Sequence, residues 1–274
     1  MHLDIYIMKK IKANKLCIEI ITNIMLVIDS VEVFLNKELD KLRKKIDLID
    51  NKILDSILER AEIVKSISSI KATKGVDILK PGREIDLLEN LYKKANSHLD
   101  GKSILYIWRE IISNITNSVQ SSFEIVIADK QDSELSKEVR NYYGSKTQKF
   151  YGYDSSEAIK KITDSKNFIA VIPIEGEWWL KSIPENIYIF GCLPVFENDC
   201  FGFLLGQVKP ERAKNNKCIL ICNEESKDLI AQKYNFTIIS NLQNKFMISI
   251  DEYYEDIDIK DVSILGSFGY IKTG

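Results

Sequence analysis

The chain has 274 residues, a net charge of -2 and a pI near 5.9. It is therefore long enough for two domains, and it lacks the basic excess that is typical of nucleic-acid-binding proteins. Its five cysteines include no CxxC pair and it has only two histidines, so the pattern of a zinc site is missing. We expect free thiols in a reducing compartment, which predicts a cytoplasmic protein.

Residues 1–34 begin with several lysines followed by an apolar run, a pattern that superficially resembles a signal peptide. Three acidic residues interrupt this run, and no small-residue cleavage site follows it. A transmembrane span needs about 20 largely uncharged residues, so we expect no membrane partner. The segment is either an additional helix or the result of a start codon placed too early, with Met8 and Met25 as alternatives.

The segment from Leu35 to Lys71 is predicted to be one long helix. Its apolar residues follow a heptad seam at Leu35, Leu39, Leu42, Ile46, Ile49 and Ile53. No proline or glycine lies between Phe34 and Lys74, so this helix would be roughly 55 Å long. One small domain does not cover such a length, and we therefore expect a partner helix from a second copy in a homodimer.

Three basic residues of this helix are candidates for a site. Arg60 falls on the apolar stripe, and Lys71 lies on the same face about 17 Å further along. Two cations that face a helical core need anions, either acids of the protein such as Glu59 and Glu62 or a bound ligand. Arg43 lies about 25 Å before Arg60 and about 100° around the axis. If Arg43 is functional, it reaches the site of a second chain packed antiparallel.

Two shorter helices are predicted to follow a proline–glycine loop, over about 83–96 and about 103–120. Glu84 lies in the first turn of the earlier helix, where the helix dipole favours a carboxylate. Thr116 and Gln120 lie one turn apart on the later helix, so they face the same way. Polar residues at a helix end are usually solvated, and this is the simpler interpretation of the pair.

Beyond residue 121 the composition changes, and strand and helix patterns alternate, which predicts an α/β domain. The chain is thus expected to have three parts, 1–34, 35–121 and 122–274. In the last part, strands are expected at 124–128, 168–176, 187–196, 201–208 and 218–223, and helices at 132–144, 155–165 (with a serine cap) and 224–234.

The stretches "LRKKIDLIDNKILDSILERAEIVKSISSIK", "PGREIDLLENL" and "IWREIISNITNSVQ" carry a family resemblance. Together they cover about 80 residues, from Leu39 to Gln120, and resemble the all-helical (type II) chorismate mutases, including the mutase part of bifunctional mutase–prephenate dehydratases. The resemblance implies an α + α/β fold with a three-helix domain in an intertwined helical dimer. It also implies conversion of chorismate to prephenate in phenylalanine and tyrosine biosynthesis, with no cofactor and no metal.

The resemblance also implies the residues of the site. They are Arg43, Arg60, Lys71, Arg83, Glu84, Thr116 and Gln120. Arg43 of the partner chain and Arg60 would bind the two substrate carboxylates, because a guanidinium binds a carboxylate through two parallel hydrogen bonds. Arg83 and Thr116 would support the pocket.

The catalytic group in this resemblance consists of Arg60 and three further residues. Lys71 and Gln120 would donate to the ether oxygen of chorismate, and Glu84 would accept a hydrogen bond from the ring hydroxyl. Lys80 is a departure, because some members of the family carry an aspartate at this position that contacts the substrate hydroxyl.

Residues 122–274 resemble, less closely, a shortened prephenate dehydratase with the end of an ACT domain. "FIAVIPIEGEWW" resembles a Val-Pro-Ile-Glu-Asn segment, and "FMISIDEYYED" with "VSILGSFGY" resembles the ACT end. Lys217-Cys218-Ile219 stands where the catalytic Thr-Arg-Phe motif is expected, so we expect a non-catalytic domain that acts in regulation or stability. Glu175, Trp178 and Trp179 either line a small-ligand pocket or pack in the core.

Two other functions stay open from the sequence. One is a bifunctional enzyme that also dehydrates prephenate, against which the missing Thr-Arg-Phe motif argues. The other is a helical dimerisation module without catalysis, which leaves Arg60 and Lys71 on the core face unexplained.

Overall fold

The computed structural model describes residues 2–74, 80–119 and 123–273. The chain divides into two compact units, Met1–Arg60 and Ala61–Gly274. The helices are α1 (His2–Lys74), α2 (Pro81–Tyr92), α3 (Gly101–Val119), α4 (Glu134–Tyr143), α5 (Ser155–Asp164) and α6 (Glu224–Lys233). The strands are β1 (Glu124–Ile127), β2 (Lys149–Phe150), β3 (Phe168–Pro173), β4 (Tyr188–Leu193), β5 (Gly202–Gly206), β6 (Asn216–Cys222), β7 (Phe236–Leu242), β8 (Lys245–Ile250) and β9 (Ser263–Gly269).

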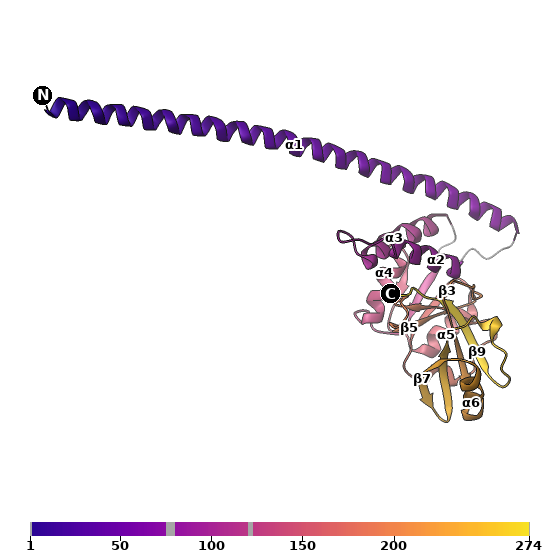
Figure 1. The fold of residues 1–274 in the computed structure, drawn as a ribbon. Helices are drawn as coiled ribbons and strands as arrows, with labels where there is room; N and C mark the ends of the chain where they lie inside the picture. Colours follow the sequence, from indigo (N-terminus) through magenta and orange to yellow (C-terminus); the bar gives the residue numbers. More distant parts are fainter. Residues whose placement is uncertain (1, 75–79, 120–122, 274) are drawn as a thin grey trace. The chain divides into compact units, whose positions relative to one another are not determined.

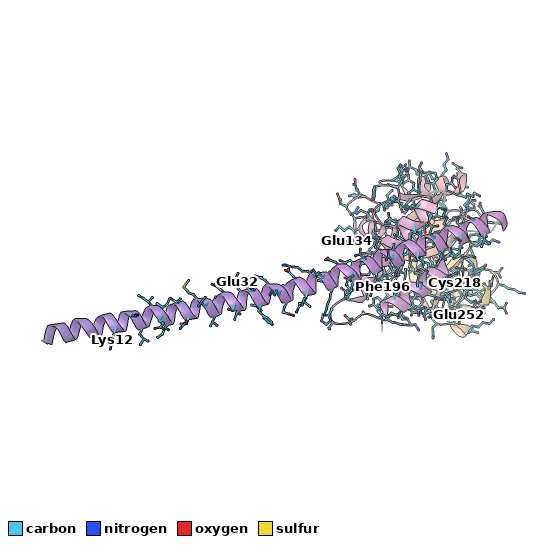
Figure 2. The ribbon with its side chains drawn as sticks, turned by 90° about the horizontal axis from the view of Figure 1, so that it is seen from above. Lys12, Glu32, Glu134, Phe196, Cys218 and Glu252 are labelled. Carbon is cyan, nitrogen blue, oxygen red and sulfur yellow. The ribbon has the colours of Figure 1, made fainter. Side chains whose placement is uncertain are left out.

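Helix α1 runs for 73 residues without interruption, so the residues before Leu35 are an extension of the predicted helix (Figure 1). Its side chains project outward along the length of the helix that includes Lys12 and Glu32 (Figure 2). The predicted apolar seam lies in solvent, with Leu39 at 47% and Ile46 at 57% exposure. Among the residues that the structure describes, no helix is long and apolar enough to cross a membrane.

The apolar seam of α1 is longer than the predicted helix. Preceding Leu35, the spacing of three and four residues continues through exposed Ile21, Ile24, Ile28 and Val31. A helix that presents a continuous apolar stripe to water is stabilised when another apolar surface covers the stripe.

Within the described residues, nine strands form one mixed sheet in the order β2-β1-β3-β5-β4-β9-β6-β8-β7. Strands β2, β1 and β3 run parallel, and β3, β5 and β4 are antiparallel neighbours. Strand β9 is parallel to β4 and antiparallel to β6, and the order ends with the antiparallel β8 and β7. The alternating strand and helix patterns therefore correctly predicted an α/β fold for this part of the chain.

Helices cover both faces of this sheet (Figure 1). One core cluster joins α2, α3 and α4 to the strands, with Leu88, Leu105 and Val139 fully or almost fully buried. A second cluster contains α5 and the short 3-10 helix Trp178–Leu180, and a third lies between α6 and the neighbouring strands. The core of the second unit thus includes the two short helices that precede the sheet.

Two local predictions needed correction. The cap of α5 is Asp154 rather than a serine, because its carboxylate accepts hydrogen bonds from the amides of Ser156 and Glu157. The Glu157 carboxylate in turn accepts from the Asp154 amide, which completes a capping box. Strands β2, β7, β8 and β9 were not predicted. Strand β7 joins β8 through Gln243 and Asn244, whose φ angles of 53° and 60° suit a tight hairpin turn.

Candidate active site

The residues predicted for the site fall in different parts of the structure. Arg43 and Arg60 lie on α1 in the first unit, and Lys71 lies in the last turn of the same helix. Arg43 forms an exposed ion pair with Asp40, at 3.2 Å between Nη1 and Oδ1, and such pairs contribute little stability. Gln120 lies outside the described residues.

Helices α2 and α3 bring two of the predicted residues together. Glu84 and Thr116 line one cavity of about 50 Å³, together with Lys80 at the start of α2. The side chain of Arg83 is exposed and is not part of this lining, although its amide donates to Glu211 Oε2 at 3.3 Å. Glu84 of α2 and Thr116 of α3 therefore share one cavity in this conformation.

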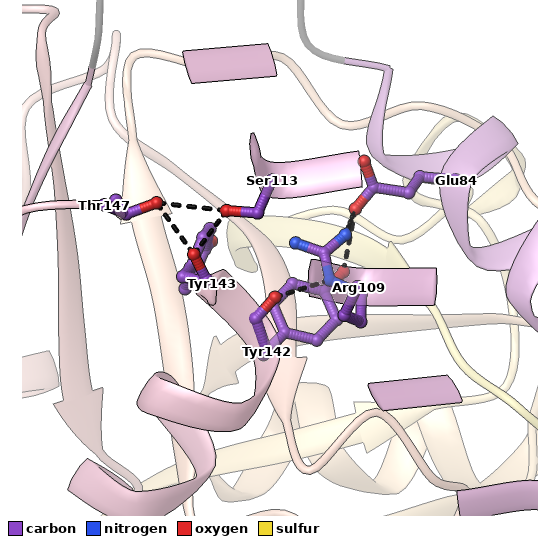
Figure 3. A network of polar contacts seen from close by, with 6 residues as sticks. All are labelled: Glu84, Arg109, Ser113, Tyr142, Tyr143 and Thr147. Atoms are coloured by element: carbon purple, nitrogen blue, oxygen red, sulfur yellow. Dashed lines mark hydrogen bonds and ion pairs between the residues drawn. The ribbon is translucent and has the colours of Figure 1, made fainter. Parts of the chain in front are cut away.

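Glu84 is bound to Arg109, a residue that the sequence analysis did not select. The carboxylate forms an ion pair with the guanidinium, and the Tyr142 hydroxyl donates to Glu84 Oε1 at 3.2 Å (Figure 3). Arg109 is only 3% exposed, donates through Nε to the Tyr142 carbonyl at 2.5 Å, and stacks 3.6 Å from the centre of the Tyr142 ring. A buried guanidinium requires such partners, because an unpaired charge in the core is costly.

A second group of hydrogen bonds fastens α3 to the end of α4 (Figure 3). The hydroxyls of Ser113 and Thr147 both donate to the Tyr143 carbonyl, the latter at 2.7 Å, and lie 3.1 Å from each other. Asn117 Nδ2 donates to Thr147 Oγ1 at 2.8 Å. A carbonyl in the last turn of a helix has no partner within the helix, so these hydroxyls satisfy it.

Tyr142 and Tyr143 are neutral in this arrangement. Burial raises the pKa of Tyr142 to about 12, although the neighbouring Arg109 cation acts in the opposite direction. Burial also raises the pKa of Tyr143. Neither phenol is therefore a general base near neutral pH, and the Tyr142 hydroxyl serves as a donor to Glu84.

We expect Tyr142→Phe to weaken the dependence of stability on alkaline pH. In the unfolded chain a tyrosine ionises near pH 10, whereas Tyr142 in the folded protein holds its proton to about pH 12. The contribution of Tyr142 to the free energy of unfolding is therefore fully present below about pH 10. It decreases as the pH rises toward 12, by up to about 1.4 kcal/mol per pH unit. Urea unfolding from pH 9 to 11.5 measures this slope.

The Tyr142→Phe protein should also lose the hydrogen bond to Glu84, which lowers its stability by a constant amount at pH 7 to 9. Above pH 10, its free energy of unfolding should decrease less per pH unit than that of the parent protein. Equal slopes would show that Tyr142 ionises equally in the folded and unfolded chains.

The beginning of α2 is held against the loop that precedes β6. Gly82 packs so closely on this loop that a Cβ atom would lie 2.6 Å from the Arg212 carbonyl oxygen. The Lys214 amide donates to Asp86 at 2.9 Å, and Asn215 donates to the buried Glu89 at 3.0 Å. These contacts fix the α2–α3 pair on the sheet, so Glu84 and Thr116 face α4 and the sheet in this conformation.

The cavity beside Glu84 is small for a substrate. Pockets for small organic molecules generally have volumes of about 300 Å³ or more, and this one measures about 50 Å³. Tyr142, Tyr143 and Phe190 line it from the side of α4 and the sheet. In this conformation the Glu84 carboxylate is therefore paired within the protein and not free to bind a substrate.

The tryptophans of the "EGEWW" stretch are core residues. Trp178 and Trp179 are 3% and 1% exposed, and Trp178 Nε1 donates to the Pro173 carbonyl at 3.0 Å. Glu175 is exposed. Of the two interpretations that the sequence allowed, packing is the one that applies to Trp178.

Comparison with known proteins gives a family match for part of the chain. Residues 42–120 match the family model described as chorismate mutase type II. An 81-residue stretch is 37% identical to a bifunctional chorismate mutase/prephenate dehydratase of Aquifex aeolicus, covering 28% of this chain and 22% of that protein. A 62-residue stretch is 40% identical to a chorismate mutase of Methanocaldococcus jannaschii, covering 23% of this chain and 63% of that protein.

Two solved structures are more distantly similar. A prephenate dehydratase from Streptococcus mutans has 14% identity and a TM-score of 0.37, over 55% of this chain and all of that one. A structure titled "GqqA- a novel type of quorum quenching acylases" has 11% identity and a TM-score of 0.38, over 53% of this chain and 94% of that one. The family match covers residues 42–120, and both sequence relatives include chorismate mutase in their names, although this chain spans 22% and 63% of their lengths.

Proposed function

We propose that the protein catalyses the rearrangement of chorismate to prephenate, and that it does so as a homodimer through α1. The observation that carries this proposal is the family match over residues 42–120, a segment that includes every residue selected for the site. In this proposal, Arg43 comes from the second copy and completes the site that Arg60 and Lys71 begin.

The rearrangement is unimolecular, so the protein needs no nucleophile and no acid–base pair for it. Catalysis consists of holding the reactive conformer and stabilising the negative charge that develops on the ether oxygen. Arginines suit the two carboxylates of the substrate, which supports the roles of Arg43 and Arg60. Lys71 and Gln120 are donors at neutral pH, which supports their roles at the ether oxygen.

The exposed seam of α1 supports the homodimer. Leu42, Ile46, Ile49 and Ile53 lie within the matched segment, and each of them is more than half exposed. Apolar side chains at this spacing fit the facing side chains of a second helix, and their burial would be favourable. An antiparallel second copy supplies such a helix and also supplies Arg43.

The proposed reaction requires a different conformation around Glu84. Glu84 is paired with Arg109 and Tyr142 in the described conformation, and its cavity is small for a substrate. Substrate binding therefore requires that Glu84 leave Arg109 and that the α4 tyrosines withdraw. The α/β part of the chain is in this proposal a regulatory or stabilising element without dehydratase activity.

The direct test incubates the purified full-length protein with chorismate and follows its loss together with the formation of prephenate. Turnover that depends on enzyme concentration supports the proposal, and its absence at every concentration tested would leave only the dimerisation function. Formation of phenylpyruvate in the same reaction would identify a bifunctional enzyme instead.

Replacing Gln120 by glutamate should nearly abolish this activity at neutral pH. A carboxylate with an ordinary pKa of about 4.3 is ionised there and would repel the charge on the ether oxygen, whereas the amide donates at every pH. The loss of one such donor costs about 3 kcal/mol, or about a hundredfold in rate. Turnover measured from mildly acidic to mildly basic pH should show recovery toward low pH.

The matched control is Ser118→Glu, which places the same charge two residues earlier at an exposed position of α3. This variant should retain most of the parent activity, and circular dichroism checks the fold of both proteins. A Gln120→Glu protein as active as the parent at neutral pH would remove Gln120 from the site.

A further inference from the structure

A cavity of about 560 Å³ lies among α3, α4 and the beginning of β2, and it is formed entirely by residues of the second unit. Every side chain that lines it carries a polar or charged group. Its volume falls within the range of small-molecule sites. None of the residues selected for the mutase site lines this cavity, so any ligand that it binds belongs to a separate site.

Lys149 of β2 supplies one of two cations to the lining. Its side chain is partly buried, and its Nζ donates to the carbonyls of Gly144 and Thr147 at 2.5 and 2.8 Å. Within residues 80–119 and 123–273, Lys149 forms no ion pair with a carboxylate. The two carbonyls hold the ammonium group beside the end of α4 and leave one of its three donors for a ligand.

Arg140 supplies the second cation from the last turn of α4. It is partly buried, and its Nη1 donates to the Gln131 carbonyl at 2.7 Å. Among the residues that the structure describes, this arginine also has no carboxylate partner. The rest of its planar fork of N–H groups can therefore bind the oxygens of a phosphate.

The two cations lie close enough to affect each other. Burial lowers the pKa of Lys149, the Glu110 carboxylate acts in the opposite direction, and the Arg140 cation lowers it further. Two partly buried cations repel each other, so an anion bound between them would be favourable. A doubly charged phosphate group matches the two positive charges.

The acids near this cavity already accept hydrogen bonds from the protein. Glu110 accepts from the hydroxyl and the amide of Ser145, at 2.6 and 3.0 Å, and from Asn114 at 2.8 Å. Glu138, which is not part of the lining, accepts from the Tyr106 hydroxyl at 3.3 Å. The Ser145 hydroxyl lowers the pKa of Glu110, so Glu110 is ionised at neutral pH and is the acid of the lining that opposes an anionic ligand.

We propose that this cavity binds a small sugar phosphate, whose phosphate pairs with Arg140 and Lys149 and whose sugar lies along Tyr106 and Tyr151. The polar lining suits a hydroxylated body, to which the Asn141 amide and the Tyr151 hydroxyl can form hydrogen bonds. The proposal rests on the cavity and its two cations, and it is independent of the mutase activity.

The test compares ribose 5-phosphate with inorganic phosphate and with ribose. Isothermal titration calorimetry of the full-length protein measures each affinity at a pH of about 7.5, where a phosphate ester is doubly charged. A salt concentration of about 0.15 M screens non-specific attraction. Ribose 5-phosphate should bind most tightly, inorganic phosphate less tightly, and ribose too weakly to measure. Equal affinities for ribose 5-phosphate and ribose would overturn the proposal, and equal affinities for ribose 5-phosphate and inorganic phosphate would overturn its assignment to a sugar phosphate.

Lys149→Met and Arg140→Met should each weaken ribose 5-phosphate by about ten- to a hundredfold, because each removes a charge-assisted hydrogen bond. Glu110→Gln should strengthen it, because the opposing charge is removed while the amide oxygen can still accept from Ser145. The matched control is Lys146→Met, which removes an exposed lysine outside the lining and should leave the affinity nearly unchanged.

Circular dichroism checks the fold of each variant. Equal losses of affinity in Lys146→Met and Lys149→Met would show a diffuse attraction by the surface and would overturn the proposed site. Binding that Lys149→Met and Arg140→Met both leave unchanged would overturn it as well.

Discussion

Mixing Arg43→Ala protein with Arg60→Ala protein should restore mutase activity that neither protein has alone. In the proposed antiparallel dimer, each site takes Arg60 from one chain and Arg43 from the other. A mixed dimer therefore has one site that lacks both arginines and one site that is intact. With equal amounts and free exchange, half of the dimers are mixed, so about a quarter of all sites should be active.

The measurement is the rate of chorismate loss after subunit exchange, which mass spectrometry of intact dimers can follow with one chain isotope-labelled. The matched control mixes the Arg43→Ala, Arg60→Ala double variant with Arg60→Ala protein, a pair that cannot form an intact site. Exchange without recovered activity would argue against a shared site, and an active monomer would argue against the dimer itself.

Replacing Arg109 by methionine should lower the free energy of unfolding by about 3–5 kcal/mol. Arg109 is almost fully buried, and its removal leaves the partly buried Glu84 carboxylate with the Tyr142 hydroxyl as its one hydrogen-bond partner among the residues that the structure describes. Methionine fills much of the space of the arginine stem, so the loss comes mainly from the charge and its hydrogen bonds. Urea unfolding at neutral pH measures the difference.

A Glu84→Leu, Arg109→Met double variant should recover most of this stability, because replacing a buried ion pair by apolar residues is often neutral. The control is Arg83→Met, which removes an exposed arginine next to Glu84 and should change stability by less than about 0.5 kcal/mol. If Arg109→Met and Arg83→Met cost the same, the ion pair of Glu84 contributes nothing to the folded state.

The sequence predicted the elements whose pattern is long and regular. The heptad seam of α1 and the apolar stripe of α3 depend on residues close in the chain, so both bounds of α3 and the end of α1 were placed within a few residues of those observed, whereas α1 begins 33 residues before the predicted start at Leu35. Among the four missed strands, β2 has only two residues, and β7 lies at an edge of the sheet, where exposed Thr237 and Ile238 give it no buried alternation. Asp154 was missed as a cap because serines follow it directly.

Some residues of the candidate site could be selected from the sequence, whereas contacts between distant segments of the chain could not. Glu84 and Thr116 were assigned from the family resemblance, and α2 and α3 place both of them on one cavity. Arg109 lies on the apolar stripe between Leu105 and Ile112, and this arginine on a buried face was the signal that could have identified it. Its partner Tyr142 lies 33 residues away on α4, a distance over which no local pattern connects the two.

The junction between β4 and β9 has a mechanical consequence. Gly266 has a φ of 148°, and a Cβ atom there would lie 2.1 Å from the Ile189 carbonyl oxygen, so the two strands approach this closely only because the residue is glycine. The β4–β5 and β6–β9 ladders on either side of the junction pair five and six residues, each with one bulge, whereas β4 and β9 pair at Ile189 and Gly266 and leave a gap beyond that point, beside a cavity. Local opening should begin at this gap, and β1 to β5 should exchange their amide protons as one group and β6 to β8 as another.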